Sequence, residues 1–155
     1  MSLILSQHLY DELRAHGEET YPHECCGIML GKSDDGARGN GDPDIIVTTL
    51  IRAGNTRTDS AHNRYNIAPQ ELIRAQREGR KAGLDIVGFY HSHPDHPAQW
   101  SSTDFAEAHW FGCAYVITSV DGDKTTGHAQ ITNSFLLTGT TEEDKAFANH
   151  PITIE

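Results

Sequence analysis

Helix-like and strand-like patterns alternate along this chain, and this alternation narrows the fold classes open to it more than any other feature. Two helices have clear boundaries: one is predicted from the N-cap Ser6 to about Glu18, the other from Pro69 to about Ala82, where Gly83 ends it. The other predicted segments are a Gly/Asp-rich loop at 32–43, a helix at 102–110, and short strands at 25–30, 44–51, 64–67, 84–90, 113–120, 128–132, 134–137 and 152–154. The predicted fold class is α/β, with a mixed central sheet flanked by helices.

Length and charge exclude several kinds of protein. The 155 residues suffice for one domain, which we predict to span 1–155, and are too few for two ordinary ones. A formal net charge of −10 argues against a nucleic-acid surface, which needs a basic patch, and against adhesion to an anionic membrane. The first residues lack the cationic and long apolar stretches of a secretory signal, and no segment has the length of a membrane span.

The cysteines indicate a reducing compartment. The chain has three, and the adjacency of Cys25 and Cys26 does not suit a disulfide framework. Neighbouring strand residues face opposite sides, so this pair cannot easily serve one metal ion, and we expect small buried side chains there. The expected location of the protein is the cytoplasm.

The segment 91–104, His-Ser-His-Pro-Asp-His-Pro-Ala-Gln-Trp-Ser-Ser-Thr-Asp, carries the clearest chemical signal. Side chains alternate faces along a strand, so His91 and His93 point the same way. Pro94 cannot donate to a sheet, so the strand should end there with both imidazoles at its exposed end. Asp104 falls in the first turn of the next predicted helix and could supply a third, anionic ligand. Two imidazoles and one carboxylate leave a fourth tetrahedral position for water, as in catalytic zinc sites.

Each element of this signal also has a plainer interpretation. Ser101 and Asp104 have the spacing of a helix capping box, which by itself carries no chemistry. A His-x-His pair in a chain with ten histidines is more often a surface or core pair than a ligand pair. An acidic residue after a proline, such as Glu24, usually lies on a solvated turn.

The spacing resembles the JAMM (MPN+) metalloproteases, in particular their short stand-alone prokaryotic members. The family pattern is histidine, any residue, histidine, proline, six residues, serine, two residues and aspartate; these positions are filled here by His91, His93, Pro94, Ser101 and Asp104. The coincidence of five fixed positions with a matching upstream strand favours a metalloenzyme over the plainer interpretations.

The resemblance covers most of the chain. The family also has a glutamate in a Pro-x-Glu-small-Cys-Gly stretch that enters a strand, and residues 22–31 fit this stretch with Glu24. The similarity continues through 64–69 and the helix after it, and weakens after about Val120. One departure is Trp100, which stands where relatives often carry proline before the serine.

The resemblance implies a fold and a mechanism. The fold would be the JAMM/MPN fold, related to the cytidine-deaminase-like sandwich. Zn²⁺ would be held by His91, His93 and Asp104 and would make a water molecule reactive near neutral pH. Glu24 would act as general base and then general acid, and the Ser101 hydroxyl would stabilise the oxyanion.

The resemblance also implies a substrate: the amide bond after the C-terminal Gly-Gly of ubiquitin-like or sulfur-carrier proteins. An extended tail would pair with a sheet edge beside the metal. We expect the tail to face the irregular segment 55–63, including Asn55, together with Tyr90, Trp100 and His96, although a solvated loop and ordinary aromatic packing explain these residues equally well. The leaving group (a peptide, a cysteine or a lysine) stays open, as does the choice between monomer and homodimer.

Three other functions are compared with this one. A nucleobase deaminase would carry His-x-Glu and Pro-Cys-x-x-Cys signatures, and neither is present. A non-catalytic MPN-type scaffold would have lost ligands that this chain retains. A DNA-repair relative of the fold would be expected to carry basic appendages, which an acidic chain lacks.

Overall fold

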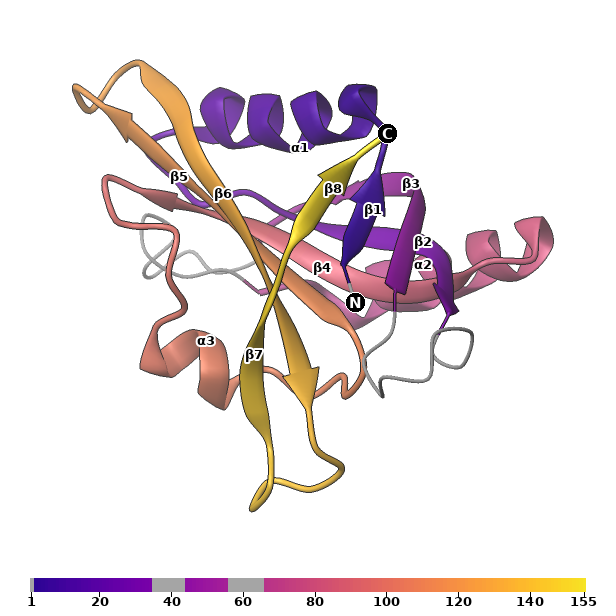
Figure 1. Ribbon diagram of the computed structural model, residues 1–155. Coiled ribbons are helices and arrows are strands. Elements are labelled where there is room, and N and C mark those ends of the chain that lie inside the picture. The colour runs from indigo at the N-terminus through magenta and orange to yellow at the C-terminus, as the bar shows by residue number, and fades with distance from the viewer. Residues whose placement is uncertain (1, 35–43, 56–65) are drawn as a thin grey trace.

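A computed structural model describes residues 2–34, 44–55 and 66–155 (Figure 1). The elements in chain order are β1 (Leu3–Leu5), α1 (Gln7–Thr20), β2 (Cys26–Asp34), β3 (Asp44–Ala53), α2 (Pro69–Ala82), β4 (Asp85–Pro94), α3 (Ser102–Ala106), β5 (Ala114–Gly122), β6 (Gly127–Thr138), β7 (Ala146–His150) and β8 (Ile152–Ile154). Most of the predicted loop and the start of the predicted strand at 64–67 lie outside the described residues; Ile67 forms an isolated bridge with Asn55. No helix in the described ranges is long and apolar enough to cross a bilayer.

The strands form one mixed sheet with the order β7-β6-β5-β4-β2-β3-β1-β8. β4 pairs in parallel with β5, and β1 pairs in parallel with both β3 and β8, while the other pairs are antiparallel. The chain passes directly from β7 at one edge to β8 at the other through Pro151, as the continuous yellow ribbon in Figure 1 shows. The sheet therefore curls so that its two edge strands are joined at Pro151.

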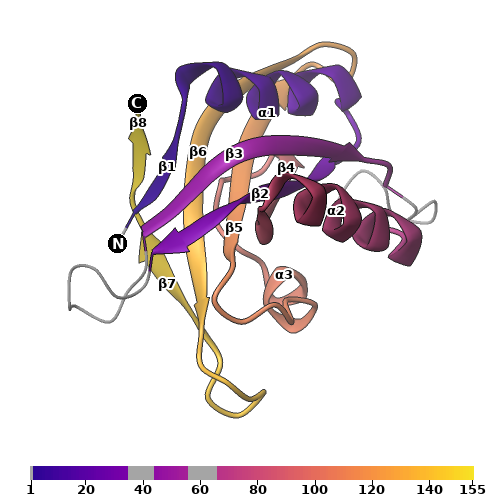
Figure 2. The ribbon, with the colours of Figure 1, turned by 90° about the vertical axis from the view of Figure 1, so that its right-hand side faces the viewer.

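Two helices cover opposite faces of the sheet (Figure 2). Leu13 of α1 packs in one hydrophobic cluster with Met29 and Tyr90, whereas Ala75 of α2 packs in another with Phe89. Alternation of side chains along β2 and β4 separates the two clusters, because neighbouring residues face opposite sides. The predicted arrangement, a mixed sheet flanked by helices, is confirmed.

The capped helices agree with the sequence predictions. The Ser6 side chain accepts a hydrogen bond from the Leu9 amide at 3.2 Å and begins α1. Gly83 takes a left-handed φ of 71° after α2. α3 is shorter than predicted, because the Lys145 ammonium binds the carbonyl oxygens of Phe105 and Ala108 at 2.8 and 3.1 Å and ends the helix there.

The strand predictions were less accurate. β6 is one strand where two were predicted, because Asn133 pairs with Ile117 in register rather than turning. β2 does not end at Gly31; it continues to Asp34 past a register shift between Leu30 and Gly31. β1 and β7 were not predicted.

Candidate metal centre

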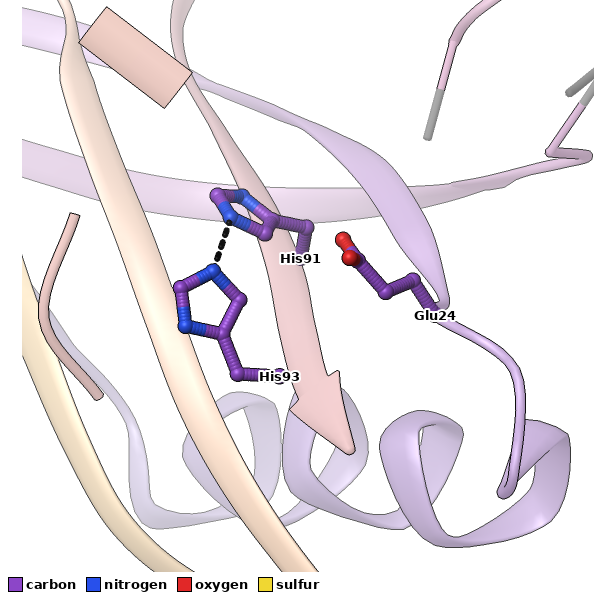
Figure 3. Close-up of side chains that lie close together, drawn as sticks. All are labelled: Glu24, His91 and His93. Atoms are coloured by element: carbon purple, nitrogen blue, oxygen red, sulfur yellow. Dashed lines mark hydrogen bonds between the residues drawn. The ribbon is translucent and has the colours of Figure 1, made fainter. Parts of the chain in front are cut away.

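The two histidines lie at the C-terminal end of β4, between β2 and β5 near the middle of the sheet. The Nε2 atoms of His91 and His93 are 3.2 Å apart, and both side chains are buried. Figure 3 shows the two rings turned toward each other. Ser92 between them faces the other way and is fully buried. The predicted alternation therefore brings both imidazoles to one side.

Asp104 reaches these imidazoles from α3. Its Oδ1 lies 3.3 Å from Nε2 of His91, and its Oδ2 lies 3.1 Å from Nε2 of His93. A capping box holds this carboxylate: the Ser101 amide donates to Oδ2 at 2.9 Å, and the Asp104 amide donates to Ser101 Oγ at 3.0 Å. The cap and the ligand interpretations of this pair are thus compatible, because the cap itself aims the carboxylate at the histidines.

The spacing of these donors suits a tetrahedral metal ion. Ligands bound at about 2.0 Å in tetrahedral geometry lie about 3.3 Å from one another. The two Nε2 atoms are 3.2 Å apart, and each has one oxygen of the Asp104 carboxylate, Oδ1 or Oδ2, within 3.3 Å. His93 Nδ1 lies 2.8 Å from the Pro97 carbonyl oxygen, so it carries the proton and Nε2 keeps its lone pair for a metal. Burial opposes ionisation of Asp104, but the closeness of the His91 and His93 imidazoles holds the pKa of its carboxyl well below its usual range.

Glu24 approaches from the segment that leads into β2, and its carboxylate points toward the histidines in Figure 3. A carboxylate oxygen of Glu24 and one ring nitrogen each of His91 and His93 all lie within 4.8 Å of one another. Glu24 is 3% exposed, and burial, helped by Asp104, raises the pKa of its carboxyl to about 8 against the opposing charge of His93. Its Oε1 has no hydrogen-bond partner within the described part of the chain. A buried carboxylate oxygen without a partner in the described ranges, close to two imidazoles, forms a donor group that could take part in holding a metal ion.

A cavity of about 380 Å³ opens beside these groups. Its lining residues are Glu24, His93, Pro94, His96, Pro97, Gln99, Trp100 and Ser101. Trp100 is 41% exposed, and its ring packs on Phe105 and Phe147 at centroid distances of 5.4 and 5.5 Å. The Asp104 amide occupies one lone pair of Ser101 Oγ, so the Ser101 hydroxyl proton can be donated toward the cavity.

The predicted substrate-facing residues divide into separate groups. Trp100 and His96 line the cavity. The side-chain amide nitrogen of Asn55 (Nδ2) lies 3.5 Å from the backbone carbonyl oxygen of Glu24, while 56–63 fall outside the described residues. Tyr90 is 1% exposed, and its hydroxyl lies 2.8 Å from Nδ1 of His16. Tyr90 therefore belongs to the core, because its position on β4 alternates with the histidines. The buried Tyr90 side chain is not available as the predicted substrate contact.

Sequence reasoning missed the Pro97 carbonyl oxygen, which orients His93. A backbone acceptor carries no side-chain signal, and only the turn formed by Pro94 and Pro97 hints at a fixed carbonyl there.

Comparisons with known proteins identify the family of this chain. Residues 6–133 match the family model described as prokaryotic homologs of the JAB domain. The chain is 33% identical over 129 residues to a desampylase of Haloferax volcanii, covering 79% of this chain and 84% of that protein. It is 31% identical over 120 residues to a probable TtuB-protein conjugate cleaving protease of Thermus thermophilus, covering 77% and 72%.

A solved structure supports the fold. A JAB1/MPN domain protein from Archaeoglobus fulgidus superposes with a TM-score of 0.54 at 13% identity, covering 98% of each chain. The family model spans most of the chain, including every candidate ligand. The chain belongs to the prokaryotic JAB family, the JAMM/MPN group.

Proposed function

We propose that this protein is a zinc-dependent peptidase or isopeptidase that hydrolyses the amide bond after the C-terminal Gly-Gly of ubiquitin-like or sulfur-carrier proteins. The observation that carries the proposal is the buried Glu24 carboxylate, whose Oε1 has no partner in the described ranges and which faces His91, His93 and, beyond them, Asp104. A carboxylate in this position serves proton transfer rather than structure.

His91, His93 and Asp104 are the residues that would hold the metal. The Asp104 carboxylate lies within 3.3 Å of both imidazoles, whereas Glu24 Oε1 has no hydrogen-bond partner among the described residues, so Asp104 is the better third ligand. Two imidazoles and a carboxylate make zinc the default choice among divalent ions. When bound, zinc supplies Lewis acidity that makes a water molecule nucleophilic near neutral pH.

The chain's own residues do the remaining work. Glu24 accepts the proton of the attacking water and later gives it to the leaving amine. The Ser101 hydroxyl donates a hydrogen bond to the oxygen that becomes anionic when the carbonyl is attacked. Trp100 and the two prolines of the cavity form an apolar wall against which an extended tail can lie.

The substrate class is supported by the relatives. One is named a desampylase and another a probable protease that cleaves TtuB-protein conjugates, which supports a protein conjugate as the substrate here. A tail ending in two glycines would fit between Glu24 and the cavity wall because it brings no side chains. Asn55 beside Glu24 is proposed as a further tail contact. We place the protein in the cytoplasm, since all three cysteines are free and buried.

The test uses small ubiquitin-like proteins extended beyond Gly-Gly, incubated with the zinc-loaded protein and analysed by mass spectrometry. We expect truncation at the second glycine, and we expect a chelator to stop it. E24Q should keep zinc and lose turnover, because glutamine preserves the shape of Glu24 but cannot take up a proton.

Two outcomes count against the proposal. Normal turnover by zinc-loaded E24Q would exclude the proposed base. Absence of stoichiometric metal from protein purified without a chelator would favour the non-catalytic scaffold.

A further inference from the structure

A hydrogen bond joins the segment that leads to Glu24 with the segment that leaves the histidine strand. Tyr21 follows α1 and stands three residues before Glu24, and Asp95 follows β4 and stands two residues after His93. The Tyr21 hydroxyl donates to Asp95 Oδ2 at 2.7 Å across a sequence separation of 74 residues. This contact, the Tyr21–Asp95 brace, lies outside the JAMM sequence pattern.

Asp95 is fixed by three further features. Its φ of 56° is in the left-handed region, which aspartate tolerates better than most residues. Its amide donates to the Val120 carbonyl at 2.7 Å, and its Oδ1 accepts from the Gly122 amide at 2.9 Å. The turn that begins at Asp95 also carries the Pro97 carbonyl oxygen, which binds Nδ1 of His93. Asp95 thereby controls the group that orients one metal ligand.

The Tyr21 ring is held just as firmly. A Cβ added at Gly122 or Gly127 would approach the Tyr21 ring to 2.7 or 2.5 Å, so both positions need glycine to admit it. The Lys124 amide donates to the Tyr21 hydroxyl at 3.0 Å, and the residue is 6% exposed. Tyr21 therefore has one position, and the chain that continues to Glu24 starts from a fixed point.

The far side of Glu24 is tied to the same strand. The Cys25 amide donates to Ser92 Oγ at 2.9 Å, and the Ser92 amide donates to the Cys25 carbonyl at 3.3 Å. In sequence, Glu24 thus lies between two contacts: Tyr21 before it binds Asp95, just after the histidine strand, and Cys25 after it binds Ser92 within that strand.

We infer that Tyr21 and Asp95 are positioning residues, which set the Glu24 carboxylate and the His93 imidazole relative to one another. The inference rests on the proposed function for its effect on turnover, but not for its effect on the metal site. If the brace served stability alone, its loss would lower the free energy of unfolding without a selective effect on turnover or on zinc affinity.

The test compares Y21F and D95G, singly and together, with D95N and a control. Y21F keeps the ring and loses only the hydroxyl. D95G removes the carboxylate and keeps the left-handed turn, and D95N tests rescue by a side chain of the same shape. The control is Y115F: Tyr115 is also 6% exposed, and its hydroxyl accepts from the Trp110 amide at 3.1 Å, remote from Glu24.

Two measurements are made on each variant, together with thermal unfolding. Loss of groups that orient a ligand typically weakens metal affinity about 10- to 100-fold, so we expect this rise in the zinc dissociation constant, measured by chelator competition, for Y21F and D95G. Displacement of reacting groups by about 1 Å costs about 100-fold in rate, so kcat should fall about 10- to 100-fold while KM stays nearly unchanged. The double variant should match D95G, because both changes remove the same Tyr21–Asp95 hydrogen bond, and D95N should recover part of the loss.

The brace is refuted if Y21F keeps the wild-type zinc affinity, if Y115F shows equal losses, or if the losses of Y21F and D95G multiply in the double variant. Should the wild-type protein cleave no carrier, the proposed function fails, and the zinc affinities alone still decide the inference.

Discussion

At the scale of single residues, Ser101 and Asp104 each combine a structural role in capping α3 with a proposed chemical role. Ser101 caps α3 through the Asp104 amide, and the same hydroxyl faces the cavity beside Glu24. The Asp104 carboxylate accepts a hydrogen bond from the Ser101 amide and lies close to both imidazoles. A change at either residue therefore alters local stability and chemistry together, and a useful test must separate the two.

Ser101→Ala should lower kcat by about 10²–10³, since it removes one donor to the oxyanion, and should leave zinc stoichiometry unchanged. It also removes a cap, which costs about 1 kcal/mol of the free energy of unfolding. Ser6→Ala is the matched control, because Ser6 caps α1 in the same way far from the site. Kinetics and urea unfolding of both variants separate the effect on catalysis from the effect on stability. An equal loss of kcat in Ser6→Ala would contradict the role of Ser101 as a donor to the oxyanion.

His16 gives the folded state a pH dependence. Burial, together with the charge of Arg52 and against that of Glu19, lowers the pKa of His16 from 6.5 to about 4. Between these values the unfolded chain binds more protons than the folded one, so stability is complete above pH 6.5 and falls as the pH drops toward 4. We expect this group to cost about 1–2 kcal/mol at pH 5 relative to pH 7.

Urea unfolding of wild type and His16→Gln at both pH values isolates this contribution. Glutamine can still accept from the Tyr90 hydroxyl but does not titrate. The loss of stability on acidification should therefore be smaller in the variant, and identical losses would show that His16 is not the responsible group.

At the scale of elements, the accuracy of the sequence predictions follows from where the signal lies. α1 and α2 were placed correctly because Ser6, Pro69 and Gly83 mark their ends locally. α3 was overestimated because Lys145, far along the chain, ends it. β1 has three residues and pairs only with distant strands, so its sequence has no periodicity to detect.

Gly31 shows how a contact between strands overrides a local signal. A glycine at the end of an apolar run suggests a strand end, yet β2 continues past Gly31. Glycine is needed at this position because a Cβ would lie 1.8 Å from the Ile46 carbonyl oxygen of the neighbouring strand. Gly31→Ala should therefore destabilise the β2–β3 pair by at least about 1–3 kcal/mol. Gly54→Ala is the control, since nothing lies within 4 Å of its added Cβ. Similar urea midpoints for the two variants would contradict the close approach.

At the scale of the whole molecule, the site depends on topology that no local pattern contains. The motif residues were predicted, but their meeting requires β4 to lie between β2 and β5 and α3 to fold back over the end of β4. The joining of the two sheet edges at Pro151 was not predicted either, because strand order depends on pairings between distant residues. The burial of Tyr90 was not foreseen for a simpler reason: it precedes the candidate ligands His91 and His93 in sequence, but its side chain lies on the other face of β4.

Because the proposed ligands from β4 and α3 come together only in the folded chain, metal binding should stabilise the folded state. A ligand that binds only the folded state adds about 4 kcal/mol at 1,000 times its dissociation constant, so zinc should raise the unfolding temperature and a chelator should lower it. D104N should lose most of the zinc-dependent shift, and E24Q should keep it, because the Asp104 carboxylate lies within 3.3 Å of both imidazoles whereas Glu24 Oε1 has no hydrogen-bond partner among the described residues. Calorimetry of both variants with and without zinc distinguishes the two ligand sets. A shift lost in E24Q and kept in D104N would make Glu24 the third ligand, and the chain would then lack the carboxylate that the hydrolysis requires.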